Sequence, residues 1–406
     1  MDANPPVRSA ARPRTGTNAA VWSAALGIAV LYFGSTVPTP LYPLYRHEFG
    51  FSEFVVTAIY AVYVIGNLLV LFLFGRLSDQ IGRRRAAVPA LCLNLVSSAC
   101  FLFAQGTAWL FAARVLNGVA AGLGAGAFTA WLAELEPDRT RAATIAATAN
   151  LMGLAAGVLL AGPLAQYGPW PLRSSWAVHL VLIVAAIGVV LPEPETVARP
   201  KRHLRDVSFR PRIGVPRGIR LAFAAPAATA FAAFALGGFY AALVPGLLGD
   251  GLNETNLFVV GAVVGSFFVA ASLTSALTAG WHSRSAVLSA LALYLPGLVL
   301  LVMAETLKSL PILVGASLVA GAAMALGYRG SLSAVNEIAP GDRRAEVLSS
   351  YLIACYLGNS LPVIGVGLLA LAVSAKTAHA VFAAVLISLA LTALVVELYG
   401  TRADTE

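Results

Sequence analysis

The sequence predicts an all-α integral membrane protein in which twelve transmembrane helices form two pseudo-symmetric six-helix bundles. Three observations lead to this prediction: the composition, the lengths of the apolar runs, and an internal repeat. The chain has 406 residues, of which 59% are hydrophobic and 11% are charged, whereas soluble domains carry roughly 25% charged residues. So few charges cannot cover a water-soluble surface. Because Gly and Pro interrupt long apolar runs, the runs indicate helices rather than the alternating strands of a membrane barrel.

Twelve apolar runs follow one another along the chain, and each approaches the ~20 residues that a helix needs to cross a bilayer. They cover residues 20–44, 54–74, 86–105, 107–132, 142–167, 175–192, 219–248, 256–279, 285–304, 309–334, 345–372 and 377–400. The polar residues 1–19, which include three prolines, predict a disordered cytoplasmic tail. We expect an N-terminal bundle over 20–192, a basic, proline-rich cytoplasmic loop over 193–218, a C-terminal bundle over 219–400 and a short cytoplasmic tail over 401–406.

The internal repeat supports this division into six and six helices. When the sequence is shifted by 203 residues (337 minus 134), Glu134, Pro137 and Arg141 fall on Glu337, Pro340 and Arg344. A weaker likeness relates Val37-Pro38 in the first run to Val244-Pro245 in the seventh. We therefore expect two parallel halves related by an axis along the membrane normal.

The basic residues are distributed unequally between the two sides, which predicts cytoplasmic N and C termini by the positive-inside rule. The side opposite the termini receives few of them: Arg46, Arg173, Lys308 and Lys376. The side of the termini receives many more: Arg8, Arg12, Arg14, Arg76, Arg83 to Arg85, Arg139, Arg141, the run from Arg199 to Arg220, Arg284, Arg343, Arg344 and Arg402. Arginine far outnumbers lysine, and Ala, Gly and Val are abundant. This composition suggests a multi-pass protein of a bacterial inner (plasma) membrane.

Residues 75–85, G-R-L-S-D-Q-I-G-R-R-R, join the second run to the third. So short and basic a connection predicts a tight cytoplasmic hairpin, in which Gly75 and Gly82 allow sharp turns and Asp79 can pair with the neighbouring arginines. On charge alone, the stretch is equally explained as an ordinary positive-inside anchor.

The order of residue types in this stretch resembles the loop between helices 2 and 3 of the major facilitator superfamily, G-x-L-x-D-x-x-G-R-[RK]-x. Every fixed position is filled, by Gly75, Leu77, Asp79, Gly82, Arg83 and Arg84. The resemblance implies the twelve-helix fold of that family and a secondary transporter that works by alternating access. It also implies a cytoplasmic gate in which Asp79 is the latch residue and the arginines are its electrostatic partners.

Two arginines fall within apolar runs, where an isolated charge costs ~2.5–3.5 kcal/mol even on the lenient insertion scale. In the fourth run, Arg114, Asn117 and Gly118 resemble the family's R-x-x-Q-G, with Asn in place of Gln. The resemblance makes Arg114 a candidate for proton coupling or for binding an anionic or hydrogen-bonding substrate group. Alternatively, Arg114 ties its helix to carbonyls or tyrosines of helices 1 and 2. Arg329, in the tenth run, either contacts the substrate or extends to the cytoplasmic interface.

Polar side chains repeat at helical spacing in three further runs, which predicts stripes that line a water-filled cavity or bond between helices. The stripes consist of Tyr32, Ser35, Thr36, Thr39 and Tyr42 in the first run; Tyr60, Tyr63 and Asn67 in the second; and Tyr351, Cys355 and Asn359 in the eleventh. We expect the stripes to contribute substrate or coupling residues.

Two departures weaken an assignment to proton-driven drug antiport. Drug antiporters of the superfamily carry G-x-x-x-G-P-x-x-G-G in helix 5, and here only Gly162-Pro163 fits. No carboxylate lies between Val21 and Tyr45, where many proton-coupled exporters carry one.

The leading hypothesis is nevertheless export of an amphipathic small molecule, a drug or a secondary metabolite, by a monomer in the lipid bilayer. The alternatives are uptake or uniport of a neutral or anionic metabolite and, in another class, a non-transporting membrane sensor or scaffold. We expect no enzyme activity, because the histidines are scattered, and no ATP-driven pump, because no G-x-x-x-x-G-K-[ST] occurs. No cofactor, metal or nucleic acid is expected, whereas a proton or other ion gradient could drive transport.

Overall fold

Helices account for nearly all of the secondary structure in the computed structural model, which describes residues 18–74, 77–197, 213–341 and 343–400. The long helices are α1 (Asn18–Thr36), α3 (Glu53–Phe74), α5 (Arg83–Leu102), α6 (Thr107–Leu135), α7 (Arg139–Tyr167), α8 (Ser174–Val190), α9 (Arg220–Ala242), α11 (Leu257–Leu277), α12 (Ser283–Thr306), α13 (Leu310–Ile338), α14 (Arg344–Leu369) and α15 (Ala375–Gly400). Short helices connect them: α2 (Tyr42–Phe49), α4 (Leu77–Ile81), α10 (Val244–Gly246), a 3₁₀ turn at Arg217–Ile219 and a π turn at Leu247–Gly251.

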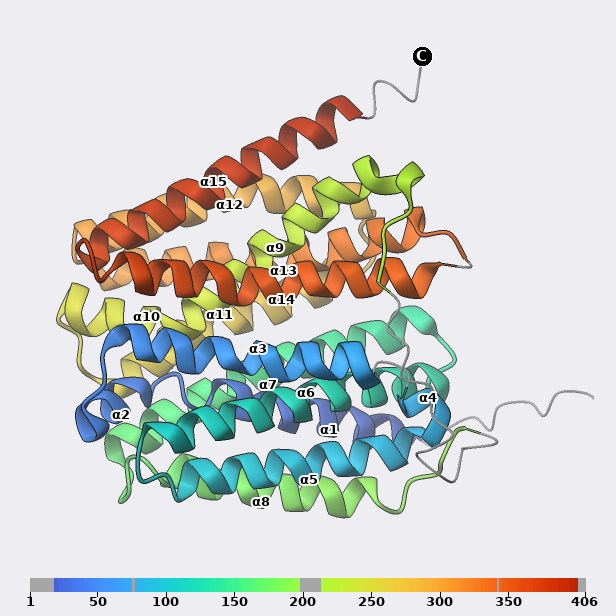
Figure 1. Ribbon diagram of the computed structural model, residues 1–406, viewed down its shortest axis with the longest axis horizontal. Helices are drawn as coiled ribbons and strands as arrows, with labels where there is room; N and C mark the ends of the chain where they lie inside the picture. Colours follow the sequence, from blue (N-terminus) through green and yellow to red (C-terminus); the bar gives the residue numbers. More distant parts are fainter. Residues whose placement is uncertain (1–17, 75–76, 198–212, 342, 401–406) are drawn as a thin grey trace, which may run out of the picture.

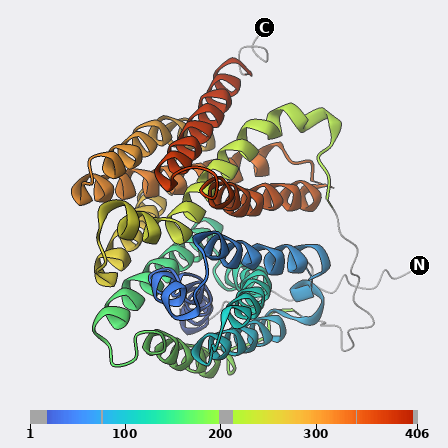
Figure 2. The ribbon, with the colours of Figure 1, turned by 60° about the vertical axis from the view of Figure 1, so that its left-hand side comes forward.

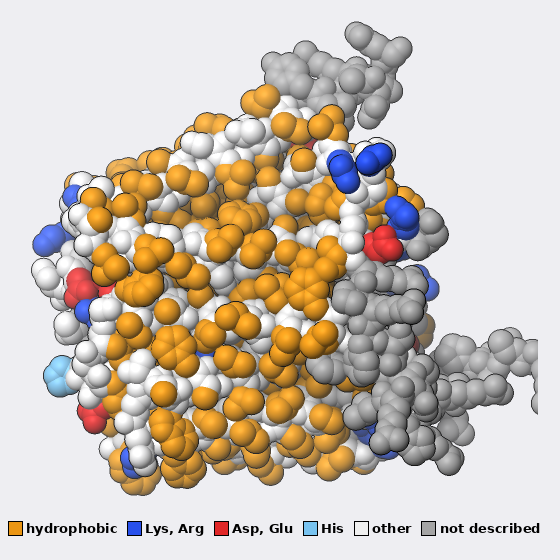
Figure 3. All heavy atoms as spheres, in the orientation of Figure 1, with side chains coloured by type: hydrophobic (Ala, Val, Ile, Leu, Met, Phe, Trp, Pro, Cys, Tyr) orange, Lys and Arg blue, Asp and Glu red, His pale blue; other side chains and the backbone are white. Residues whose placement is uncertain are grey.

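Eleven of these helices are long and apolar enough to cross a membrane, counted over the described residues. The expected sixth span, α8, has 17 residues and therefore rises about 26 Å, slightly less than a bilayer core. Figure 3 shows hydrophobic side chains over the body of the molecule and charged side chains gathered at its two ends. This distribution suits a multi-pass protein whose body lies in lipid.

The prediction of one helix over 20–44 is wrong at its C-terminal end. The helix α1 ends at Thr36, a turn follows, and α2 begins at Tyr42. Pro38 and Pro40 lie in this turn, where each lacks a backbone donor and disfavours helical geometry in the residue before it. The seventh predicted helix, 219–248, ends early for the same reason, because α9 stops at Ala242 and Pro245 lies in the short α10.

The two halves of the chain repeat one packing scheme. In the first half, α1 packs on α6 and α7, α3 on α6, and α5 on α6 and α8. In the second half, α9 packs on α13 and α14, α11 on α13, and α12 on α13 and α15. Figures 1 and 2 show the two groups as separate bundles lying side by side. We call them the N-half (α1 to α8) and the C-half (α9 to α15).

The halves meet along two helix pairs, α7 with α11 and α3 with α14. Close contacts cluster toward the end that carries α2 and α10, here called the α2 end. There, a Cβ on Gly162 would lie 3.1 Å from Cα of Gly261, and the amide of Leu257 donates to Gln166 at 2.8 Å. A Cβ on Gly367 would lie 2.4 Å from the Thr57 hydroxyl. The opposite end, which carries α4, is called the α4 end (Figure 1).

The two expected tails and much of the expected 193–218 loop lie outside the described residues, apart from Asn18 and Ala19, which begin α1, and the loop residues 193–197 and 213–218. Gly75 of the gate motif also lies outside them.

Candidate functional site

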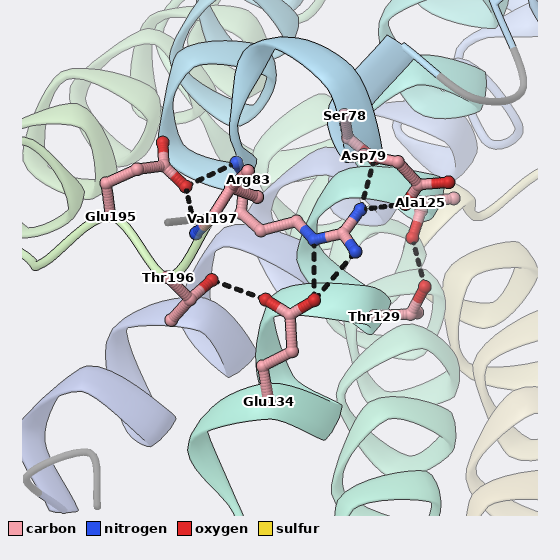
Figure 4. Close-up of polar contacts among 9 residues, drawn as sticks. All are labelled: Ser78, Asp79, Arg83, Ala125, Thr129, Glu134, Glu195, Thr196 and Val197. Carbon is pink, nitrogen blue, oxygen red and sulfur yellow. Dashed lines mark hydrogen bonds and ion pairs between the residues drawn. The ribbon is translucent and has the colours of Figure 1, made fainter. Parts of the chain in front are cut away.

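A charged cluster at the α4 end is built around the buried Arg83, the first residue of α5 (Figure 4). The Nε and Nη2 atoms of Arg83 both donate to Oε1 of Glu134, on α6, at 3.0 and 2.7 Å. Its Nη1 donates to the Ser78 hydroxyl at 2.9 Å and to Asp79. The planar guanidinium thus joins three chain segments in a way that an ammonium could not.

The structure makes Arg83, rather than Asp79, the centre of this cluster. The side chain of Asp79 is 54% exposed, whereas that of Arg83 is 10% exposed. The second carboxylate, Glu134, was not among the gate residues expected from the sequence, because it lies 51 residues from Arg83 along the chain.

The segment that follows α8 closes over the cluster. The carboxylate of Glu195 accepts hydrogen bonds from the backbone amides of Arg83 at 2.7 Å and Arg85 at 3.4 Å, so it caps the N-terminus of α5. Thr196 donates to Glu134, and Arg84 donates to the Glu193 carbonyl at 2.9 Å. All these contacts stay within the N-half and the first residues of the linker.

Gly82 is required where it stands in this cluster. Its φ is +114°, a conformation that side chains disfavour, and a Cβ there would lie 2.3 Å from Glu195.

Arg114 lies deep within the N-half and is 1% exposed. It donates to the carbonyl of Ser35 at 2.8 Å and to the hydroxyl of Tyr42. Its Cζ also lies 5.6 Å from the ring centroid of Tyr60 and 6.0 Å from that of Tyr63, within the range of a cation–π interaction. One of the two hypotheses for Arg114 described such contacts, with carbonyls or tyrosines of the first two predicted spans, 20–44 and 54–74.

No carboxylate pairs with Arg114 in the part of the chain that the structure describes, and its Nε lacks a partner. A buried charge that only neutral groups stabilise is costly. This arrangement is expected where a protein retains the charge for its function.

One contact connects the Arg114 environment to the C-half. The hydroxyl of Tyr60, whose ring packs against Arg114, donates to Oδ1 of Asn359, on α14, at 3.0 Å. Through Tyr60, Arg114 therefore lies one side chain away from the surface where the halves meet.

Two tyrosines from each half lie near one another. They are Tyr32 on α1, Tyr63 on α3, Tyr328 on α13 and Tyr356 on α14, and we call them the tyrosine cluster. Tyr32 lies near Tyr63 and Tyr328, and Tyr356 lies near all three. All four remain partly exposed although they lie inside the assembly of helices. Together they offer hydroxyls and ring faces to a guest between the halves.

Tyr328 and Tyr356 were not among the residues singled out from the sequence. Tyr356 lies one residue after Cys355 in the eleventh run, so it falls off the stripe that Tyr351 begins. Tyr328 precedes Arg329, and an aromatic residue beside a charge inside an apolar run is the signal that would have found it.

Other expected site residues lie inside one half instead of between the halves. Asn117 donates to Asn94 at 3.0 Å, Thr36 donates to the carbonyl of Leu154 at 2.7 Å, and the amide group of Asn67 faces the carbonyl of Tyr63 at 3.5 Å. Tyr351 is fully buried and interacts with Ser331 at 2.8 Å. In the structure Asn117, Thr36 and Tyr351 bond helices to each other, as expected for polar side chains that do not line a cavity. Asn67 bonds within α3.

Arg329 is half-buried on α13, and its Nε and Nη2 are buried without hydrogen-bond partners. Buried donors are almost always satisfied in folded proteins. Two unsatisfied donors on one guanidinium therefore mark a place where a further acceptor would be stabilised.

Gly118 sets the distance between α3 and α6, on which the position of Arg114 depends. A Cβ at this residue would lie 2.0 Å from the Tyr63 carbonyl, which belongs to rigid backbone. We expect Gly118→Ala to lower the free energy of unfolding by about 1–3 kcal/mol through overpacking. Thermal or denaturant unfolding in detergent measures this change. Gly126→Ala, on the same helix, is the matched control, because no atom lies within 4 Å of its Cβ. Equal stability of the two variants would contradict the proposed close approach.

Comparison with known proteins identifies one family over most of the chain. The family model described as Major Facilitator Superfamily matches residues 24–361. An uncharacterized MFS-type transporter of Mycobacterium tuberculosis (strain ATCC 25618 / H37Rv) is 27% identical over 185 residues, which are 44% of this chain and 26% of that protein. The cephamycin export protein CmcT of Amycolatopsis lactamdurans is 31% identical over 193 residues, which are 47% of this chain and 38% of that protein.

The MFS efflux transporter aclA of Aspergillus oryzae is 27% identical over 149 residues, which are 36% of this chain and 26% of that protein. The chain thus spans between about a quarter and two fifths of the length of these curated relatives.

Proposed function

The chain belongs to the Major Facilitator Superfamily, and from this premise we propose that it is a secondary transporter that exports an amphipathic small molecule by alternating access. Membership of the family, with the all-helical fold, makes it a membrane transporter. The direction of transport, the substrate and the mechanism are the proposed part. By the positive-inside rule, the proposal places the α4 end and both termini in the cytoplasm of a bacterial cell.

The tyrosine cluster is the observation that carries this proposal. It draws Tyr32 and Tyr63 from the N-half and Tyr328 and Tyr356 from the C-half, so a molecule bound there would contact both halves at once. Aromatic rings with polar edges suit an amphipathic guest. Because secondary transporters bind substrate near the bilayer midplane where their repeats meet, the cluster lies where such a site is expected.

The contacts between the halves support alternating access. Glycines at the α2 end allow the helices α7 and α11 to approach closely, since a Cβ on either Gly162 or Gly261 would lie 3.1 Å from Cα of the other. Small residues of this kind let the helices pack closely through van der Waals contacts that can separate again. We call the contact surface between the two halves at the α2 end the seam. We propose that the halves rock about the tyrosine cluster and that the seam at the α2 end opens as the α4 end closes. Arg83 and its carboxylates would then act in closing the α4 end.

Two relatives, CmcT and aclA, are named for export or efflux, which favours export over uptake. A second candidate, transport of an anionic metabolite, is favoured by the unpaired charge of Arg114 and the unsatisfied donors of Arg329. In a non-transporting sensor, no substrate would account for the unpaired charge of Arg114 or the unsatisfied donors of Arg329.

Transport by the purified protein in proteoliposomes tests the proposal. A panel of amphipathic compounds that includes a cephamycin, together with neutral and anionic metabolites, is measured by counterflow and under an imposed pH gradient. We expect an amphipathic compound to accumulate at least about tenfold faster than in empty liposomes, a difference that ~1.4 kcal/mol of activation free energy produces. Transport of anionic metabolites alone would favour the second candidate. Folded protein that moves none of these compounds would contradict both.

A further inference from the structure

A buried carboxylate–imidazole pair joins α12 to α15 at the α2 end. Nδ1 of His379 lies 3.0 and 3.1 Å from the two carboxylate oxygens of Glu305. The side chains are 3% and 6% exposed, respectively. The residues lie 74 positions apart in the sequence. His379 lies near the start of α15 and Glu305 in the last turn of α12, so only the fold brings them together.

The hydrogen bond fixes where a further proton can bind. A carboxylate only accepts, so Nδ1 of His379 must carry the hydrogen that it donates to Glu305. The free lone pair of the neutral ring is then on Nε2. Among the described residues Nε2 has no hydrogen-bond partner, and His379 lines a pocket of about 220 Å³. Nε2 is therefore the atom of His379 that can take up a further proton.

The pocket lies where the two halves meet. Its lining includes Glu53, at the start of α3 in the N-half, and Gly246, Asp250, Glu305 and His379 of the C-half. The carboxylate of Glu53 lies against Gly246, where a Cβ would be 2.7 Å from Oε1. Asp250 forms an ion pair at 3.4 Å with Arg46, on α2 of the N-half. The Glu305–His379 pair therefore lies beside the seam, whose contacts must separate if the α2 end opens.

The charged groups around this pair determine how proton uptake changes the local net charge. The third helix α3 contributes Glu53, the π turn contributes Asp250, and α15 contributes Lys376. Arg46 reaches Asp250 from α2, whereas α9 contributes the uncharged ring of Phe239, 5.2 Å from His379. With neutral His379, three carboxylates face two cations, an excess of one negative charge. One proton on Nε2 removes this excess.

We propose that the Glu305–His379 pair is a proton-binding site that controls the seam at the α2 end: proton uptake at Nε2 favours the closed seam, and proton loss favours the open one. This deepens the proposed transport function, on which it rests, by naming the proton as the ion that acts on one conformational step. Without the proton, Glu53, Asp250 and Glu305 repel one another across the seam. With it, the imidazolium attracts the carboxylates of both halves.

Distance measurements without any substrate test the proposal and separate it from the question of what is transported. Spin labels are attached to Trp170→Cys in the N-half and Leu371→Cys in the C-half, which lie at the α2 end and are 66% and 65% exposed. Cys92 and Cys100 are replaced by alanine, and the buried Cys355 is retained. Distances are recorded by double electron–electron resonance in lipid nanodiscs at acid and alkaline pH, across the range of about pH 5 to 8 in which histidine changes charge.

For the native pair we expect the ratio of long to short distances to rise about tenfold on going to alkaline pH, a coupling of ordinary size. His379→Gln keeps a donor to Glu305 but cannot bind the proton, so long distances should dominate at both pH values. Glu305→Gln removes the third carboxylate, so short distances should dominate at both. His47→Gln, an exposed histidine at the same end, is the matched control and should follow the native protein.

Several results would overturn the proposal. They are a native distance distribution that does not change with pH, a His379→Gln variant that keeps the native pH response, or two variants that shift in the same direction. Proton uptake by unbuffered protein gives a second measurement that needs no conformational change. We expect His379→Gln to take up one proton fewer per molecule over this pH range, and equal uptake would also contradict the assignment.

Discussion

Replacing Arg114 by lysine is expected to lower the transport rate by at least about tenfold, or ~1.4 kcal/mol in activation free energy. The guanidinium donates to the Ser35 carbonyl and the Tyr42 hydroxyl while it packs against Tyr60 and Tyr63. An ammonium is a point charge on a flexible stem and cannot reproduce this planar set of contacts. Because Tyr60 bonds to Asn359 of the C-half, misplacing its ring would disturb the surface between the halves. The measurement is the initial transport rate in proteoliposomes.

Arg141→Lys is the matched control, because the side chain of Arg141 is 58% exposed and forms a single ion pair, with Glu136 at 3.4 Å. Surface pairs of this kind contribute ~0–1 kcal/mol, so this variant should transport normally. The unfolding of the Arg114→Lys variant must be measured in parallel. If its stability falls but its transport rate is unchanged, Arg114 has a packing role alone, and the functional interpretation of its buried charge is wrong.

Replacing Arg83 by methionine should have the second large effect. Arg83 joins Asp79, Ser78 and Glu134 through one guanidinium, and its loss leaves two carboxylates near each other without their cation. Since the Asp79 and Glu134 side chains are 54% and 36% exposed, solvent limits the penalty, and we expect a loss of about 1–2 kcal/mol in unfolding free energy. Transport should fall about tenfold, since ~1.4 kcal/mol in a conformational equilibrium shifts it by this factor.

Arg85→Met controls for the removal of a positive charge at the same end, because the Arg85 side chain is exposed. Asp79→Asn should be milder than Arg83→Met, because Glu134 still pairs with Arg83 in that variant. Transport rates and unfolding curves of the three variants check this order. If Asp79→Asn proves the most damaging, the structure-based assignment of Arg83 as the centre is contradicted.

The fold was largely predictable from the sequence, and α3 shows why. An uncharged run from Phe54 to Phe74 can be stable in lipid only as a helix, because lipid offers no partners to backbone groups. The places where prediction failed were helix ends. Pro38 and Pro40 interrupt an apolar run whose average hydropathy gives no warning of the break, so the first residues of α2 were expected to continue α1. Hydropathy reports burial, whereas proline acts through local backbone geometry.

The candidate site was only partly predictable. A charge in an apolar run, such as Arg114 or Arg329, is visible in any sequence because its cost does not depend on its neighbours. The residues around these charges could not be predicted in this way. They lie in distant segments, and only their contacts in the folded protein single them out: Glu134, Asn359, Tyr328 and Tyr356. The stripes that hold Tyr32 and Thr36 in the first run and Tyr63 in the second could be drawn from helical periodicity. Periodicity did not separate Thr36, which bonds inside the N-half, from the two tyrosines, which lie near tyrosines of the C-half.

The sequence by itself determined that this protein lies in a membrane, that it has twelve helical segments in two similar sets, and that a short basic stretch joins the second segment to the third. Each of these follows from residue type and spacing along the chain. Only the tertiary structure decided which polar side chains bond within one half and which lie between the halves. It also decided that Arg83, rather than Asp79, is the centre of the charged cluster, and that Glu305 and His379 form one buried pair. Contacts between segments 51 and 74 residues apart depend on how helices pack, and packing is a property of the whole folded chain.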